Sequence, residues 1–223
     1  MRVLMIAGPG AGKGTQGERI AEHFGVPHIA TGDLLRDNVS RGTDLGKQVE
    51  QFLDKGELVP DQVVLDMVRE ALGAAKKDSG GFVLDGVPRT MQQARALYQV
   101  GIELGITADV ALHLQVAEDE LIRRLLARAE QEARADDTED VIRHRLALYR
   151  EVTEPILGWY NSRGILVSVG GERPVDDLTR EILTALEMLR SVVDAAPEGE
   201  RQSVDLTGLD AAFHAAPQGS SSG

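Results

Sequence analysis

The chain has 223 residues and a mass of 24.1 kDa, enough for one sizeable domain with small inserted lobes and too little for two large independent domains. Its 24 Lys and Arg against 36 Asp and Glu give a formal net charge of −12, which argues against a nonspecific grip on nucleic acid or on anionic membranes. The absence of cysteine excludes disulfide bonds, thiolate metal sites and cysteine catalysis, and we expect a cytoplasmic protein.

The apolar pattern predicts strands that alternate with helices along the chain. The first apolar run, 2–6, is too short for a signal peptide or a membrane span, and no later run approaches the roughly 18 apolar residues that a span requires. Strands are predicted at 2–6, 28–30, 81–85, 110–114 and 165–169, and helices at 14–24, 63–75, 91–104, 118 to about 160, and 175–193. This alternation predicts an α/β fold with a central parallel sheet that helices cover on both faces.

Two segments fall outside this alternation. Residues 34–54 show helical spacing, and glycines at 42, 46 and 56 are expected to divide this region into short helices. After residue 193 the composition changes to Ala, Ser, Gly, Pro and scattered acids, ending in Gly-Ser-Ser-Ser-Gly. Too little apolar area remains there to offset the entropy cost of ordering the chain, so we expect 194–223 to be a disordered, low-complexity tail.

A glycine-rich segment between the first strand and the first helix carries the strongest chemical signal, Gly8-Pro9-Gly10-Ala11-Gly12-Lys13-Gly14-Thr15. In this position glycines let backbone N–H groups converge on phosphate oxygens, and the start of the helix adds positive potential. Lys13 supplies a point charge for terminal phosphates. The alternative is a glycine-rich turn with a solvated lysine, which the flanking strand and helix disfavour. The segment therefore predicts a phosphate-binding loop.

This loop departs from the strict nucleoside-triphosphate pattern at two positions. Ala7 stands where a glycine is expected, and the hydroxyl of Thr15 comes one position late because Gly14 follows the lysine. If the backbone at Ala7 needs a positive φ, Gly8 is expected to absorb the turn.

The displaced hydroxyl is a feature of adenylate kinases, and the chain resembles that family from Met1 to about Leu189. The resemblance is also carried by Thr31-Gly32-Asp33-Leu34-Leu35-Arg36, by Leu58-Val59-Pro60-Asp61, and by Asp85-Gly86-Val87-Pro88-Arg89-Thr90 with Gln93. It implies a P-loop nucleoside-kinase three-layer fold over 1–193, a monophosphate-binding insertion at 31–60 and a short lid at 129–138. It further implies the reaction ATP + AMP ⇌ 2 ADP, Mg²⁺ with ATP, small-molecule nucleotides as the partners, and a monomer.

The same resemblance assigns residues to the two nucleotides. ATP would be bound by Gly8, Gly10, Ala11, Gly12, Lys13, Gly14, Thr15, Arg124 and Arg128. AMP would be bound by Thr31, Arg36, Val59, Gly86, Arg89, Gln93, Arg134 and Arg145, with Gln93 recognising adenine. The cations expected around the transferred phosphoryl group are Lys13, Arg89, Arg124, Arg128, Arg134 and Arg145. The family usually has Phe where Val87 stands, so we expect weaker packing beside the base.

The distribution of basic residues agrees with this assignment. Arginines outnumber lysines 19 to 5, and the planar guanidinium binds phosphate through two parallel hydrogen bonds. Arg124 and Arg128 are four residues apart and share one helix face. Three further arginines of this region, Arg123, Arg143 and Arg150, are expected to be solvated or salt-bridged. Asp137 or Thr138 is well placed to cap the helix that carries Arg145.

Asp85 follows a buried strand and is expected to face the phosphate-binding loop, where an acid would hold hydrated Mg²⁺ through water. Asp33 is a second candidate, and either acid could instead be a turn residue. Two other functions stay open: a UMP/CMP kinase of the same fold, against which Gln93 argues because that group resembles Asn there, and a catalytically silent nucleotide-binding protein.

Overall fold

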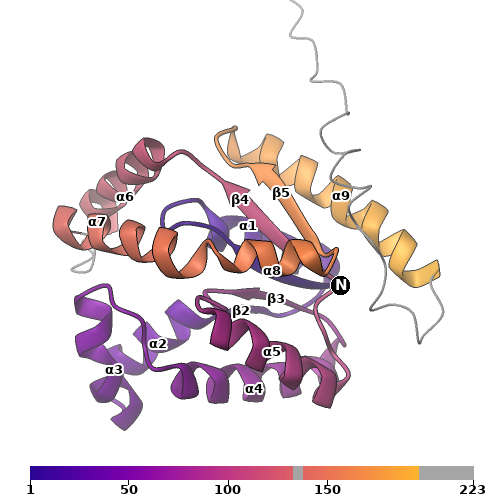
Figure 1. The fold of residues 1–223 in the computed structure, drawn as a ribbon, viewed down its shortest axis with the longest axis horizontal. Helices are drawn as coiled ribbons and strands as arrows, with labels where there is room; N and C mark the ends of the chain where they lie inside the picture. The colour runs from indigo at the N-terminus through magenta and orange to yellow at the C-terminus, as the bar shows by residue number, and fades with distance from the viewer. Residues whose placement is uncertain (133–137, 196–223) are drawn as a thin grey trace, which may run out of the picture.

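Residues 1–132 and 138–195 are described by a computed structural model, in which a five-stranded parallel sheet is covered by helices on both faces (Figure 1). The strands lie in the order β2-β3-β1-β4-β5. Their bounds are β1 Arg2–Ile6, β2 His28–Ala30, β3 Phe82–Asp85, β4 Val110–Gln115 and β5 Leu166–Gly170. The predicted α/β class and parallel sheet are confirmed, and each predicted strand agrees with the structure to within one residue at either end.

The alternating faces of β1 build two separate hydrophobic cores. Val3 and Met5 belong to a core with α1 (Lys13–Phe24), α6 (Glu118–Glu132), α7 (Glu139–Leu148) and α9 (Val175–Ala195). Leu4 and Ile6 point to the opposite face, whose core includes α2 (Thr31–Ser40), α3 (Asp44–Asp54), α4 (Asp61–Asp78), α5 (Met91–Leu104) and α8 (Ile156–Ser162). Burial of the central strand on both faces explains its unbroken apolar sequence.

Two details of the predicted helices are wrong. The single helical stretch expected from 118 to about 160 is instead α6, then α7, a π-helical turn at Tyr149–Thr153, and α8. Gly46 does not divide the insertion but lies inside α3, because a Cβ there would sit 2.1 Å from the carbonyl oxygen of Asn38 in α2. Gly42, in contrast, lies in the turn between these helices, and Gly56 follows α3, as predicted.

The ends of the later helices are as follows. Thr138 caps α7 by accepting a hydrogen bond from the N–H of Val141, which confirms one of the two predicted caps. Helix α9 runs two residues past the predicted end, to Ala195, and the rest of the predicted tail lies outside the described residues. Among the described helices, none is both long and apolar enough to cross a membrane.

Candidate active site

The glycine-rich loop joins β1 to α1 at the carboxyl edge of the sheet, beside the end of β3, where nucleotide sites of open α/β sheets form. A cleft of about 580 Å³ opens there, and it is lined by residues that include Ala7, Lys13, Arg145, Tyr149 and Thr153. An adjoining cavity of about 570 Å³ is lined by residues that include Thr31, Arg36, Val59, Val64 and Gln93. The two spaces share Gly56, Leu58, Gly86, Arg89 and Arg145, so they are two halves of one site.

The loop takes its turns at positions different from those expected. Gly10 and Gly12 have positive φ angles of 83° and 91°, whereas Gly8, which was expected to absorb a turn, does not lie in the left-handed region. A Cβ at Gly8 would instead sit 2.8 Å from Leu121 Cδ1, and one at Gly10 would sit 2.8 Å from Leu125 Cγ. The loop therefore packs closely against α6, which also carries Arg124 and Arg128.

Lys13 sits at the start of α1 with its ammonium group turned back onto the loop. Its Nζ donates hydrogen bonds to the carbonyl oxygens of Ala7 (2.9 Å) and Gly8 (3.1 Å). Burial lowers the pKa of Lys13 to about 8; the charge of Asp85 opposes this shift, and the charges of Arg89, Arg145 and Arg128 add to it. Four cations thus share a small volume, which an anionic ligand would stabilise.

Arg89 connects the two halves of the site. Its Nε donates to the carbonyl oxygen of Gly86 (2.7 Å), and burial, followed by the charge of Arg145, lowers the pKa of its guanidinium. Thr31 lies alongside, with its hydroxyl donating to the carbonyl oxygen of Asp85 (3.2 Å). Arg36 lines the outer cavity and forms an ion pair with Asp33.

Gln93 is 2% exposed, and its amide orientation is fixed by two hydrogen bonds. Its Oε1 accepts from the backbone N–H of Arg89 (2.7 Å), and its Nε2 donates to Asp61 Oδ1 (2.7 Å). Asp61, the last residue of the Leu58-Val59-Pro60-Asp61 motif, therefore orients Gln93, a role that the motif alone does not indicate. Val87, expected beside the base, lies in the core at 1% exposure and lines neither half of the cleft.

Asp85 ends β3 next to the loop. Its Oδ1 is buried and has no hydrogen-bond partner among the described residues, although Lys13 and Arg89 lie close enough to interact with its charge. A carboxylate oxygen without a protein donor is suited to accept from the water shell of a hydrated cation. Asp33, the second candidate, is exposed and paired with Arg36 instead.

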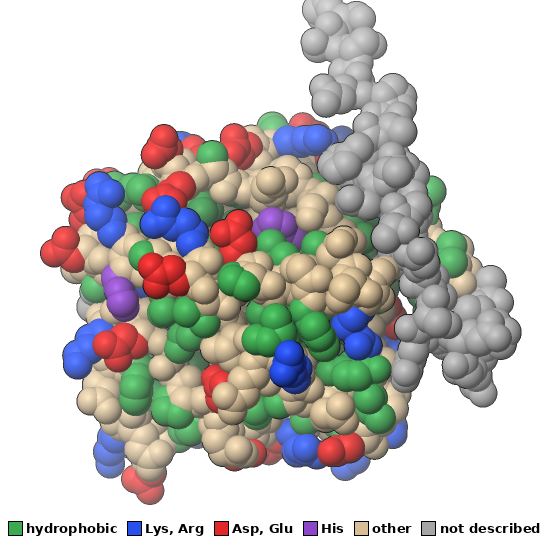
Figure 2. Space-filling view, in the orientation of Figure 1, with side chains coloured by type: hydrophobic (Ala, Val, Ile, Leu, Met, Phe, Trp, Pro, Cys, Tyr) green, Lys and Arg blue, Asp and Glu red, His purple; other side chains and the backbone are tan. Residues whose placement is uncertain are grey.

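The described arginines of α6, α7 and the π-helical turn divide into groups. As expected, three form surface ion pairs: Arg123 with Glu120, Arg143 with Glu139, and Arg150 with Glu118. Figure 2 shows the resulting mixture of basic and acidic side chains over α6 and α7. Arg124 contacts Glu120 (2.6 Å) and donates to the carbonyl oxygen of Gly171 (3.0 Å). Hydrogen bonds from Arg123 and Arg124 lower the pKa of Glu120 to about 2.

Several predicted site residues come together and others do not. Lys13, Arg89 and Arg145 line the inner half, and Thr31, Arg36, Val59 and Gln93 line the outer half. Neither half is lined by Arg124, and Arg134 lies outside the described residues. Tyr149 and Thr153 line the inner half although no sequence motif marked them, because a π-helical turn leaves no distinctive residue pattern.

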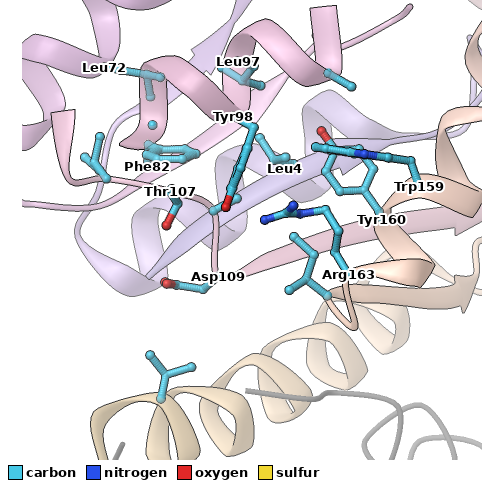
Figure 3. A pocket seen from close by; sticks show the side chains of 16 residues that line it. Leu4, Leu72, Phe82, Leu97, Tyr98, Thr107, Asp109, Trp159, Tyr160 and Arg163 are labelled. Carbon is cyan, nitrogen blue, oxygen red and sulfur yellow. The ribbon is translucent and has the colours of Figure 1, made fainter. Parts of the chain in front are cut away.

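A further cavity of about 670 Å³ lies at the opposite, amino-terminal edge of the sheet (Figure 3). Its walls are core side chains together with Tyr98, Trp159 and Arg163, whose guanidinium lies 3.7 Å above the Tyr98 ring. Its described charged lining residues are Arg163 and Asp109, of opposite sign, whereas the glycine-rich loop and Lys13 lie at the carboxyl edge, where phosphate binding is expected.

Comparisons with known proteins agree with this geometry. The adenylate kinase family model matches residues 5–165. An adenylate kinase of Kocuria rhizophila is 50% identical over 186 residues, covering 83% of this chain and 98% of that protein. Adenylate kinases of Thermobifida fusca (45% identical, 84% and 98% covered) and Thermus thermophilus (44% identical, 82% and 96% covered) are similar over the same extent. A chain with this loop, this two-part cleft and this degree of similarity belongs to the adenylate kinase family.

Proposed function

We propose that the chain transfers the terminal phosphoryl group of ATP reversibly to AMP, giving two ADP, and so balances the purine nucleotide pool. One observation carries this proposal: the loop that suits a triphosphate and the pocket that contains Gln93 open into each other at Arg89 and Arg145. Two nucleotides bound there would have their phosphates meeting at the shared arginines.

The transfer needs no general base, because an oxygen of the AMP phosphate is already ionised. A bond forms from this oxygen to the terminal phosphorus of ATP while the bond from that phosphorus to the bridging oxygen of ADP breaks, and no proton has to move. Rate enhancement then depends on positioning and on charge neutralisation. Lys13, Arg89 and Arg145 are the cations that line the inner half of the cleft, and we assign Arg124, Arg128 and Arg134 to the same task from the family resemblance.

Mg²⁺ fits this site through Asp85, whose orphaned Oδ1 would hold the water shell of the ion. When bound, the ion would supply positive charge that neutralises part of the charge of the ATP phosphates. Lys13 would contact the terminal phosphate. Its ammonium group, which now donates to the carbonyl oxygens of Ala7 and Gly8, would donate to the phosphate oxygens of ATP instead.

Water must be excluded, since it competes with AMP as acceptor. We propose that 31–60 acts as the monophosphate-binding insertion and 129–138 as the short lid, within a kinase domain at 1–193. Support comes from Gly56 at the end of α3: a Cβ there would lie 2.7 Å from Arg145 Cγ, so the insertion already touches the base of the lid. The lack of cysteine fits the reducing cytoplasm, and the family resemblance supports a monomeric enzyme.

A coupled assay of ADP formation with ATP and each of AMP, CMP, UMP and GMP tests the proposal. We expect AMP to be the preferred acceptor and Lys13→Met to lose nearly all activity while it keeps its fold. Lys47→Met is the matched control, because that lysine is exposed and pairs only with Asp44 among the described residues. Activity on UMP equal to or greater than that on AMP would contradict AMP as the preferred acceptor and favour a UMP/CMP kinase. ATP binding without any ADP formation would indicate a catalytically silent nucleotide-binding protein.

A further inference from the structure

The π-helical turn at Tyr149–Thr153 lies between α7 and α8, directly beside the cleft. It is closed by a hydrogen bond of 2.8 Å from the N–H of Glu154 to the carbonyl oxygen of Tyr149, five residues back. Turns of this kind are rare and concentrate at functional sites. Both of its terminal residues line the inner half of the cleft.

The turn changes which residues face the site. In a regular α-helix each residue advances about 100°, so Thr153, eight residues after Arg145, would be rotated by roughly 80° from it. The wider π-turn takes more residues per revolution and reverses part of this rotation. As a result Arg145, Tyr149 and Thr153 line the same cleft, although they span two turns of helix.

Thr153 fixes the backbone of Arg89. Thr153 is 7% exposed, and its hydroxyl donates a hydrogen bond to the carbonyl oxygen of Arg89 (2.9 Å). The N–H of Arg89 is held by Gln93 (2.7 Å) and its Nε by Gly86 (2.7 Å). Arg89, which we assign to the phosphate of AMP, is therefore held at its backbone N–H, at its backbone carbonyl and at its guanidinium.

Tyr149 supports the other nucleotide's loop. Its ring reaches the space next to Gly8, where a Cβ would lie 3.8 Å from two ring carbons. Its hydroxyl lies 3.4 Å from His113 Nε2, and His113 Nδ1 lies 3.3 Å from the hydroxyl of Ser168. Burial raises the pKa of Tyr149 to about 12 and lowers the pKa of His113, so the two rings meet as neutral groups that share one hydrogen bond, whose direction is set by the tautomer of the imidazole.

We propose that Tyr149 and Thr153 are positioning residues, through which one π-turn holds the loop for the phosphoryl donor and the arginine for the acceptor at a fixed separation. The inference rests on the proposed function, because it concerns how that reaction is aligned. Each residue acts through another: Tyr149 through the glycine-rich loop, and Thr153 through Arg89.

The test measures KM for ATP, KM for AMP and kcat in the full chain. Thr153→Val should raise KM for AMP roughly tenfold and leave KM for ATP within about twofold, since it removes one hydrogen bond on the acceptor side. Thr153→Ser keeps the hydroxyl and should restore KM for AMP. Tyr149→Phe keeps the ring and should raise KM for ATP roughly threefold, with little effect on AMP. The control is Thr184→Val, whose hydroxyl donates to a helix carbonyl on α9, away from the cleft.

A merely structural role would lower the unfolding midpoint of these variants and leave both KM values as in the parent, and that result overturns the inference. So does an equal rise of both KM values in Thr153→Val. If Thr153→Val fails to fold, Tyr149→Phe still decides, because an unchanged KM for ATP in that variant overturns the inference. An inactive parent chain would instead refute the proposed function.

Discussion

Gly56 offers a direct test of how the proposed insertion at 31–60 meets Arg145, at the base of the proposed lid. It follows α3, has a φ of 68°, and lines both halves of the cleft. Replacing it with alanine adds a single methyl group. That methyl would lie 2.7 Å from Arg145 Cγ and 3.0 Å from both Arg145 Cδ and Val141 Cγ1.

Two separate effects follow from this substitution. The left-handed backbone disfavours a Cβ by about 1–2 kcal/mol, which appears as lost free energy of unfolding. The contact with Arg145 involves the first carbons of its side chain rather than its flexible end, so the guanidinium must move. A displacement of about 1 Å at a group that aligns the reactants lowers the rate by roughly 100-fold. We therefore expect Gly56→Ala to lose stability and to lose far more activity.

Gly42→Ala is the matched control. This glycine lies in the same proposed insertion and has a similar φ of 63°, but a Cβ there would meet no atom of the described residues within 4 Å. Denaturant unfolding should show comparable destabilisation of both variants, and the coupled assay should show a large fall in kcat only for Gly56→Ala. Equal kinetics in the two variants would refute the idea that Gly56 makes room for Arg145.

Three further predictions concern charge and base recognition. Because the pKa of Lys13 is about 8, kcat/KM for ATP should fall roughly tenfold per pH unit above that value as the ammonium loses its proton, and a flat profile to pH 10 would contradict this. Asp85→Asn removes the charge that raises the pKa of Lys13, so the fall of kcat/KM at alkaline pH should begin at a lower pH, and the Mg²⁺ concentration for half-maximal rate should rise. No change in either measurement would count against the role of Asp85. Asp61→Ala frees the amide of Gln93, and the preference for AMP over CMP in kcat/KM should fall roughly tenfold, whereas an unchanged ratio would show that Asp61 does not orient it.

Much of the fold followed from local sequence patterns. Strands buried on both faces, such as β1, carry continuous apolar runs, and the glycine-rich loop marks itself because its glycines and lysine are adjacent in the chain. These features depend on neighbours in sequence, which is why they could be predicted. Gly46 was wrongly predicted to end a helix, because its role is to let α2 pack closely on α3, and that contact between helices is not visible in the local sequence.

The parts of the site that could not be predicted depend on three-dimensional proximity. The low pKa of Lys13 arises from burial and from arginines far away in sequence. The orientation of Gln93 depends on Asp61, 32 positions earlier, and the support of Arg89 depends on Thr153, 64 positions later. The π-turn that aligns Tyr149 and Thr153 has an ordinary helical sequence, so no periodicity reveals it.

The most direct measurement is a crystal structure of the chain with two adenosines joined through a chain of phosphates. The phosphates should run from the glycine-rich loop and Lys13 to Arg89 and Arg145, with one adenine against Gln93 in the outer half. A complex whose triphosphate end lies away from that loop, or whose second adenosine lies outside the pocket of Thr31 and Gln93, would contradict a two-nucleotide site built on this cleft.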